Sequence, residues 1–226
     1  MVTKISMSPA DDTFLSSSRD RTVRLWSATS AGCLAELKLP EQTEKDPLAI
    51  FDSTGLVFAV TASMTGGQGH YLHLYDARKY DAGAFAELKV SHDHLQQAIQ
   101  THVNVAPNEA GVFATADWTS IQFNTSGNQI FVGTDKGMTI AMDGFEGTVQ
   151  RVFPGTAQRP AVSCVTADDK TLLTGNDDGS ISCWSVESGE LLKRLEGHPG
   201  SVQAIAANPK YAQFASACKQ TALWIW

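Results

Sequence analysis

The eleven residues "SSSRDRTVRLW" (residues 16–26) have a counterpart at the end of the chain, "SACKQTALWIW" (residues 216–226). In both copies, small residues precede a tight polar turn, and alternating apolar residues then lead to a tryptophan. An alternation with a period of two beside a turn is typical of a β-hairpin. We therefore expect the same hairpin near both ends of the chain.

Further copies of this hairpin lie between the two. "TGNDDGSISCW" ends at Trp184 and "VGTDKGMTIAM" ends at Met142, so that 42 residues separate Trp226 from Trp184 and Trp184 from Met142. Tyr75 of "YLHLYD" takes the aromatic position 49 residues after Trp26 and 67 before Met142, and these longer steps require insertions. One more apolar segment precedes each hairpin and another follows most of them, which makes about four strands per unit.

A four-stranded unit that recurs about every 40 to 45 residues is the spacing of WD-type β-propeller blades. We expect an all-β propeller of about five blades, at residues 1–39, 47–90, 117–154, 160–197 and 200–226, with an insertion at 91–116. The chain starts in the first strand of a blade and stops on a third strand. This predicts a seven-bladed ring whose N-terminal blades are absent; a closed ring of five blades, one of them incomplete, is the alternative.

Composition adds limits on function. A net charge of −7 argues against nonspecific binding of nucleic acid and favours protein partners. Apolar runs are too short to span a membrane and the first residues lack the apolar core of a signal peptide, so we expect an intracellular protein. Unpaired thiols are expected at all four cysteines, Cys33, Cys164, Cys183 and Cys218.

Each blade of this type has residues that can stabilise it. A hydroxyl on the second strand, an aspartate in the tight turn and a tryptophan on the third strand can share hydrogen bonds. The candidates are Ser18 or Ser16 with Asp20 and Trp26 in the first copy, Thr174, Asp178 and Trp184 in the fourth, and His198 of the Gly-His pair before the fifth. The other copies are degenerate, with Tyr75, Met142 and Lys219-Gln220 at these positions.

Catalytic and metal-binding signals are weak. His92, Asp93, His94 and His102 lie close together in "SHDHLQQAIQTH", but one His-x-His group without a second ligand cluster rarely marks a metal site. A polar surface loop with a short amphipathic turn, its apolar side formed by Leu95, Ala98 and Ile99, is the favoured interpretation. We expect no enzyme activity, no cofactor and no metal.

The long irregular stretches, 39–47, 63–70 and 91–117, all fall where a propeller opens on one face. This face carries the turns between second and third strands and the links between blades, whereas the turns of the opposite face stay short. Binding residues concentrate on loops that a rigid scaffold presents, so this is the expected partner surface. Neutral growth of the loops is the alternative.

Four segments resemble the WD-repeat subunit that is shared by COMPASS-type histone lysine methyltransferase complexes and a nuclear phosphatase complex linked to transcription termination. They are "SMSPADDTFLSSSRDRTVRLW", "FDSTGLVFAV", "LYDARKYDAGAFAELKV" and "NPKYAQFASACKQTALW". The resemblance runs over nearly the whole chain and implies a seven-bladed ring. The chain departs from the pattern in lacking the first two blades and in its longer link, residues 91–117, before the tryptophan that Trp118 matches.

This resemblance implies a nuclear, non-catalytic scaffold that docks the methyltransferase and links it to the phosphorylated tail of RNA polymerase II. A general WD-repeat adaptor, such as a ubiquitin-ligase substrate receptor, is the alternative. A phosphorylated tail needs basic groups. The partner-binding candidates are Arg19, Arg21, Arg24, His70, Trp118 and Lys219, with ordinary surface charge as the alternative for the cations.

Overall fold

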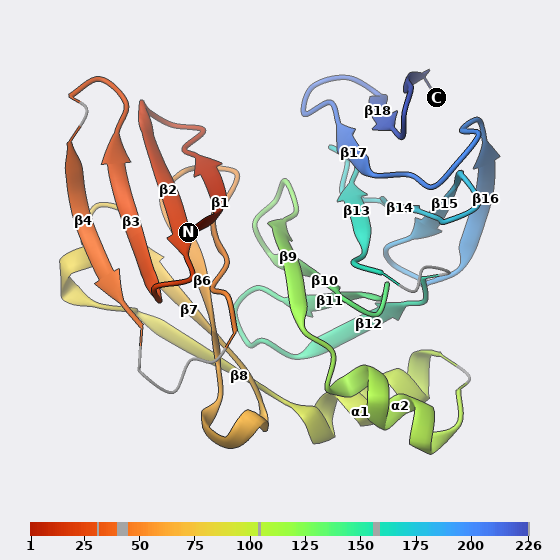
Figure 1. Ribbon diagram of the computed structural model, residues 1–226, viewed down its shortest axis with the longest axis horizontal. Helices are drawn as coiled ribbons and strands as arrows, with labels where there is room; N and C mark the ends of the chain where they lie inside the picture. Colours follow the sequence, from red (N-terminus) through yellow and green to blue (C-terminus); the bar gives the residue numbers. More distant parts are fainter. Residues whose placement is uncertain (31, 40–44, 104, 156–158, 226) are drawn as a thin grey trace. The chain divides into compact units, whose positions relative to one another are not determined.

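The computed structural model describes residues 1–30, 32–39, 45–103, 105–155 and 159–225. These residues form five antiparallel sheets, and in each sheet the strands lie side by side in sequence order (Figure 1). This confirms the predicted all-β fold of propeller-type blades. No helix among the described residues is long and apolar enough to cross a membrane.

The chain divides into two compact units, and the division falls within helix α1. Unit one comprises Met1–Leu95 and Gly144–Thr148 and contains sheets one and two. Sheet one consists of β1 (Val2–Met7), β2 (Thr13–Ser18), β3 (Thr22–Ser27) and β4 (Cys33–Lys38). Sheet two consists of β5 (Ala49–Phe51), β6 (Val57–Ser63), β7 (Gly69–Asp76) and β8 (Ala86–Ser91), with 3-10 helices η1 (Thr65–Gly67) and η2 (Tyr80–Ala82) in its loops.

Unit two comprises Gln96–Asp143 and Val149–Trp226 and contains the other three sheets. Sheet three consists of β9 (Trp118–Phe123), β10 (Gln129–Thr134), β11 (Thr139–Asp143) and β12 (Val149–Phe153). Sheet four consists of β13 (Val162–Val165), β14 (Thr171–Gly175), β15 (Ser180–Ser185) and β16 (Leu191–Glu196). Sheet five consists of β17 (Ala204–Ala207), β18 (Gln213–Ala217) and β19 (Thr221–Ile225).

Both faces of a central sheet are packed. In unit two, Leu172 and Leu173 are neighbours on β14 and therefore point to opposite faces, yet both have no exposed surface. Leu172 belongs to a cluster with Phe131 of sheet three, and Leu173 to a cluster with Phe214 of sheet five. In unit one, Leu15 of sheet one shares a core cluster with several residues of sheet two. Within each unit, face-to-face burial between neighbouring sheets is thus the main source of hydrophobic stabilisation.

The stretch between sheets two and three is helical, which corrects the expectation of a polar surface loop there. Helix α1 (His92–His102) begins after Ser91, whose Oγ accepts a hydrogen bond from the backbone N–H of His94 at 3.3 Å. A serine at this position stabilises a helix start. Leu95 and Ile99 lie one helical turn apart and are buried, as the predicted amphipathic pattern requires. Helix α2 (Pro107–Ala114) begins with a proline, a residue favoured in the first turn.

Candidate functional site

A tryptophan on the third strand donates a hydrogen bond to a hydroxyl on the second strand in sheets one, four and five. The donor–acceptor distances are 2.8 Å from Trp26 Nε1 to Ser16 Oγ and 2.9 Å from Trp184 Nε1 to Thr174 Oγ1. In sheet five the distance from Trp224 Nε1 to Ser216 Oγ is 2.7 Å. We call each such contact a tryptophan–hydroxyl pair. Because the serine and threonine side chains are buried, water cannot readily replace these bonds.

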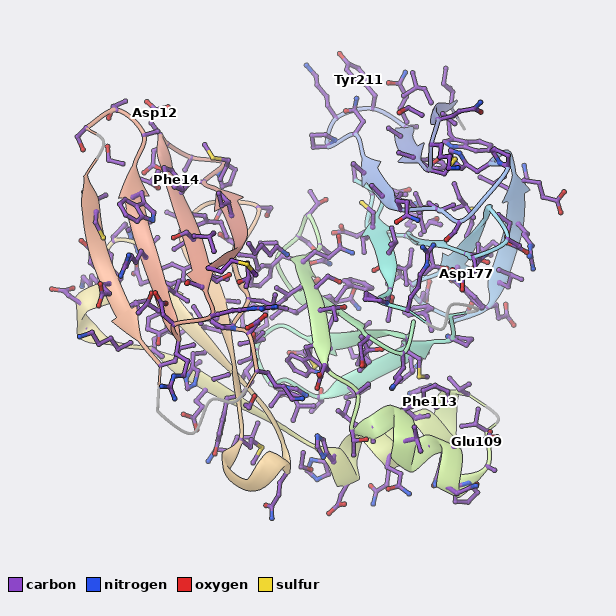
Figure 2. The ribbon with its side chains drawn as sticks, in the orientation of Figure 1. Asp12, Phe14, Glu109, Phe113, Asp177 and Tyr211 are labelled. Atoms are coloured by element: carbon purple, nitrogen blue, oxygen red, sulfur yellow. The ribbon has the colours of Figure 1, made fainter. Side chains whose placement is uncertain are left out.

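Of the two serines considered for the first copy, Ser16 is the partner of Trp26. Ser18 Oγ instead donates to the carbonyl oxygen of Met1 at 3.0 Å, which connects the end of β2 to the start of β1. Ser16 and Ser18 lie two residues apart and share a face of the strand, so the alternating pattern of the sequence does not show which serine bonds Trp26. The register does: Trp26 lies opposite Phe14, and its ring stacks on that phenylalanine (labelled in Figure 2) with 6.2 Å between ring centroids.

Sheet five has the most extended network. Ser216 Oγ bonds both Trp224 Nε1 and His198 Nε2, the latter at 2.6 Å, and a hydroxyl with one proton and two lone pairs can serve both. A Cβ atom on Gly197 would lie 2.7 Å from the ring of Trp224. The Gly-His pair therefore has two physical roles: Gly197 leaves room for the indole, and His198 bonds the serine.

The structure corrects the repeat spacing at the end of the chain. The hydrogen bond identifies Trp224 as the counterpart of Trp184, so the step is 40 residues and not 42. Only three residues lie between paired Ala217 and Thr221, whereas five lie between Gly175 and Ile181. The hairpin turn is two residues shorter and has no aspartate. Trp226, which was counted as the last tryptophan of the pattern, lies outside the described residues.

Sheets two and three have an apolar pair at the same place. Tyr75 and Met142 occupy the tryptophan position, opposite Phe58 and Ile130 in the strand register. The hydroxyl position, two residues beyond the paired residue, is occupied by Val60 and Val132, and both are fully buried. The indole donor and its hydroxyl acceptor are therefore absent together in these two sheets.

The turn aspartates of sheets one and four bind residues of their own turns. Asp20 accepts hydrogen bonds from the hydroxyl of Thr22 at 2.6 Å and from its backbone N–H at 3.0 Å, and these bonds lower the pKa of Asp20. Asp178 accepts the equivalent bonds from Ser180, which lower its pKa, and Arg194 of β16 adds an ion pair. Both aspartates therefore stabilise the hairpin turn.

The candidate arginines Arg19 and Arg24 are in ion pairs. Arg19 Nε lies 3.0 Å from Asp46, which belongs to the link before sheet two, and Arg24 Nε lies 3.1 Å from Glu36 on β4. Arg21 is exposed, with a positive φ of 64° in the tight turn, and Lys219 is exposed in the shortened turn of sheet five. A phosphate arriving at Arg19 or Arg24 would compete with a carboxylate already in place.

His70 and Trp118 are buried, with 6% of each residue's surface exposed. The His70 ring lies 6.0 Å from that of His92, in an edge-on arrangement. Because both residues are packed inside the protein, little of their surface is accessible to a partner. His92 and His94 are two residues apart on a helix and so point in different directions. Within the described part of the chain, no three His, Cys, Asp or Glu side chains could together hold a metal ion.

On the predicted partner face of unit two, a charged network connects one turn with two links between sheets. Asp177 lies in the β14–β15 turn (labelled in Figure 2), and its Oδ1 is 2.6 Å from Arg159 Nε and 3.1 Å from Ser201 Oγ. Arg159 also donates to the carbonyl oxygen of Val202 at 2.9 Å. Sequence reasoning missed this network because its members lie far apart in the chain. Of the predicted stretch 39–47, residues 40–44 lie outside the described residues.

Comparison with known proteins agrees with this geometry. The family model "WD domain, G-beta repeat" (WD40) matches residues 1–27, 147–185 and 189–226. These segments contain the third strands of sheets one, four and five, the three sheets that have a tryptophan–hydroxyl pair. The sheets with apolar pairs lie almost entirely outside the matched segments, as expected when the residues that define the repeat are replaced.

Relatives match the chain along most of its length. WD repeat-containing protein 82 of Drosophila melanogaster is 31% identical over 99% of this chain and 63% of its own length. COMPASS component SWD2 of Saccharomyces cerevisiae is 26% identical over 96% of this chain and 62% of its own length. Set1 complex component swd2 of Schizosaccharomyces pombe is 27% identical over 82% of this chain and 47% of its own length.

The chain thus spans about three fifths of the length of the Drosophila and Saccharomyces proteins. Its repeat spacing, its sheets, its tryptophan–hydroxyl pairs and its relatives agree with one another. The chain therefore contains WD40 repeats, and its homologues include WD repeat-containing protein 82 and COMPASS component SWD2.

Proposed function

We propose that this protein is a non-catalytic scaffold subunit of a Set1/COMPASS-type histone lysine methyltransferase complex and acts in the nucleus. The observation that carries the proposal is the extent of the similarity. The alignments to the Drosophila and Saccharomyces proteins cover 99% and 96% of the chain, including sheet two and the first three strands of sheet three, which the general WD40 model does not match. Similarity in those sheets reflects more than the repeat pattern common to WD proteins.

The physical features of the molecule suit such a role. Sheets packed face to face make a rigid support, and the network of Arg159, Asp177 and Ser201 holds turns and links of one face in place. Rigid presentation of loops lowers the entropy that is lost when a partner binds. In this proposal, the partner face formed by the turns and links receives the methyltransferase subunit.

The proposal extends to two further partners that the family resemblance implies: the phosphorylated tail of RNA polymerase II and the termination-phosphatase complex. Arg19, Arg21, Arg24 and Lys219 are the cations that we assign to a phosphorylated tail. Asp46 and Glu36 would then have to release Arg19 and Arg24. Binding should accordingly be weak and should fall steeply with rising salt.

The experiment is affinity purification of the protein from its own cells, with a tag after Trp226 and mass spectrometry of the bound proteins. We expect subunits of a histone lysine methyltransferase complex, together with phosphatase-complex subunits. Recovery of ubiquitin-ligase subunits without any methyltransferase subunit would contradict the proposal and would favour a general adaptor. A tagged Arg19→Glu/Arg21→Glu/Arg24→Glu variant tests the RNA polymerase contribution separately: it should lose polymerase peptides and keep the methyltransferase.

A further inference from the structure

The loop between β7 and β8 of sheet two forms a cavity that none of the interactions above uses. The cavity measures about 520 Å³, within the range of small-ligand and side-chain pockets. Its walls come from the start of β6 and from the β7–β8 loop, all within unit one. The lining includes Leu56, Val57, Asp76, Arg78, Lys79 and Phe85, with small residues at 82–84.

The walls of this cavity are held firmly. The backbone N–H of Ala77 donates to the carbonyl oxygen of Leu56 at 2.8 Å, and that of Phe85 donates to Leu74 at 2.9 Å, which fixes both ends of the loop. Tyr80 of η2 packs against the core cluster of unit one, and its hydroxyl lies 3.4 Å from the carbonyl oxygen of Leu34 on β4. The cavity is therefore part of the fold and does not depend on a mobile loop.

Two large apolar side chains that line the cavity are exposed to solvent. Phe85 has 60% of its surface exposed and Leu56 has 47%, and both line the cavity. Phe85 stays exposed to solvent even though its backbone is fixed by the hydrogen bond to Leu74. Exposed apolar surface beside a preformed cavity is typical of a binding site.

The charged residues that line the cavity indicate which charge a ligand should carry beside its apolar group. Asp76 holds Arg78 through two bonds, from Nε at 3.1 Å and from Nη2 at 3.0 Å, so this pair is neutralised. Lys79 is exposed, and no ion pair to it is found among the described residues. The lining thus carries two cations and one carboxylate on a protein of net charge −7. This excess of positive charge complements a carboxylate.

We infer that this cavity is a docking site for a peptide segment that has a phenylalanine or leucine anchor next to an acidic residue. The anchor lies against Phe85 and Leu56, and the carboxylate lies beside Lys79. The inference rests on the proposed function only in taking another protein as the ligand. It adds a second contact surface, away from the predicted partner face.

The test uses the full chain and a fluorescein-labelled peptide of the sequence Gly-Ser-Asp-Phe-Glu-Ser-Gly, followed by fluorescence anisotropy. We expect Phe85→Ala to weaken binding about tenfold and Leu56→Gln to weaken it about fivefold, since each removes part of the apolar contact. Lys79→Glu should weaken binding about threefold, and less at high salt. Phe145→Ala is the matched control: Phe145 is 73% exposed and lies outside the cavity lining, so binding should not change.

Two altered peptides complete the design. A peptide with alanine in place of phenylalanine should lose binding, and one with lysines in place of both acids should bind more weakly than the original. Equal affinity for all peptides, or equal affinity of the wild type and Phe85→Ala, would overturn the inference. Circular dichroism of each variant shows whether it is folded, which we expect because the altered side chains are largely exposed.

The outcome is separable from that of the proposed function. If the purification recovers the methyltransferase complex but the peptide does not bind, this docking site is wrong and the scaffold role stands. If the peptide binds as described and no methyltransferase subunit is recovered, the docking site stands and serves a different protein partner.

Discussion

The tryptophan–hydroxyl pair is present in sheets one, four and five and absent from sheets two and three. In the first group a half-buried tryptophan bonds a buried hydroxyl. In the second group a tyrosine or methionine lies at the tryptophan position and a valine replaces the hydroxyl. Neither group mixes the two kinds. A tryptophan facing valine would leave a buried N–H without a partner, and this costs more than replacing both groups by apolar ones.

The comparison shows that a degenerate repeat can remain well packed. Phe58 and Tyr75 stack with 5.0 Å between ring centroids and 7° between ring planes, close to the 5.6 Å and 7° of Phe214 and Trp224. Aromatic packing at this position is thus preserved in sheet two after the hydrogen bond is gone. The pattern that defines a WD repeat and the packing that stabilises a blade are therefore separate properties.

The largest effect is expected where one hydroxyl serves two partners. Ser216→Ala removes the partner of both Trp224 and His198 and leaves a buried imidazole and a half-buried indole N–H without this hydrogen bond. We expect the free energy of unfolding to fall by about 2 to 4 kcal/mol. Urea denaturation followed by tryptophan fluorescence measures it. Ser163→Ala, a half-buried serine on β13, is the control and should change stability by less than about 0.5 kcal/mol.

A smaller effect is expected in sheet four, where the hydroxyl has one tryptophan partner. Thr174→Val keeps the shape of the side chain and removes the bond to Trp184, so that the free energy of unfolding falls by about 1 to 2 kcal/mol. Thr171→Val on the same strand is the control, because its hydroxyl is not bonded to the indole.

The double variant Thr174→Val/Trp184→Met copies the pair of sheet three into sheet four. It should cost at least about 1 kcal/mol less than the sum of the two single variants, because donor and acceptor are lost together. Strict additivity in this double-mutant cycle would mean that the hydrogen bond is not what distinguishes the two groups of sheets.

The smallest effect concerns the ion pair of sheet two. Hydrogen bonds from the Arg78 side chain and backbone lower the pKa of Asp76 from 3.8 to about 2. A carboxyl group whose pKa is depressed by folding stabilises the protein above its ordinary pKa, and this contribution is lost as the pH falls from about 4 towards 2. Nuclear magnetic resonance titration of Asp76 should give the depressed pKa.

Two variants check this interpretation. Arg78→Gln should bring the pKa of Asp76 back towards its usual range, since the charged donor is gone. Asp76→Asn should make stability less dependent on pH below 4. An unchanged titration in Arg78→Gln would show that the arginine is not the cause. We expect only a small change in stability, because the pair is on the surface, where salt and water screen it.

Much of the fold could be predicted from short-range patterns. Alternating apolar residues and polar turns depend on a few neighbouring positions, so the strands and the five units could be found directly. Part of the candidate site was accessible in the same way: Trp26, Trp184 and Thr174 were recognised from their places in the repeat. The helices at 92–102 and 107–114 were missed, because a short amphipathic turn does not reveal how far a helix extends.

The amino-acid sequence by itself determined the repeat, the all-β class and the kinds of residue at the positions of the tryptophan–hydroxyl pairs. Only the tertiary structure decided that Ser16 and not Ser18 bonds Trp26, that Trp224 is the last tryptophan of the pattern, and that Val60 and Val132 complete the apolar pairs. The physical reason is that strand formation follows a local periodicity of two, whereas register depends on the length of each turn. Ion pairs such as Arg19 with Asp46 join residues far apart in the chain, and no local pattern encodes them.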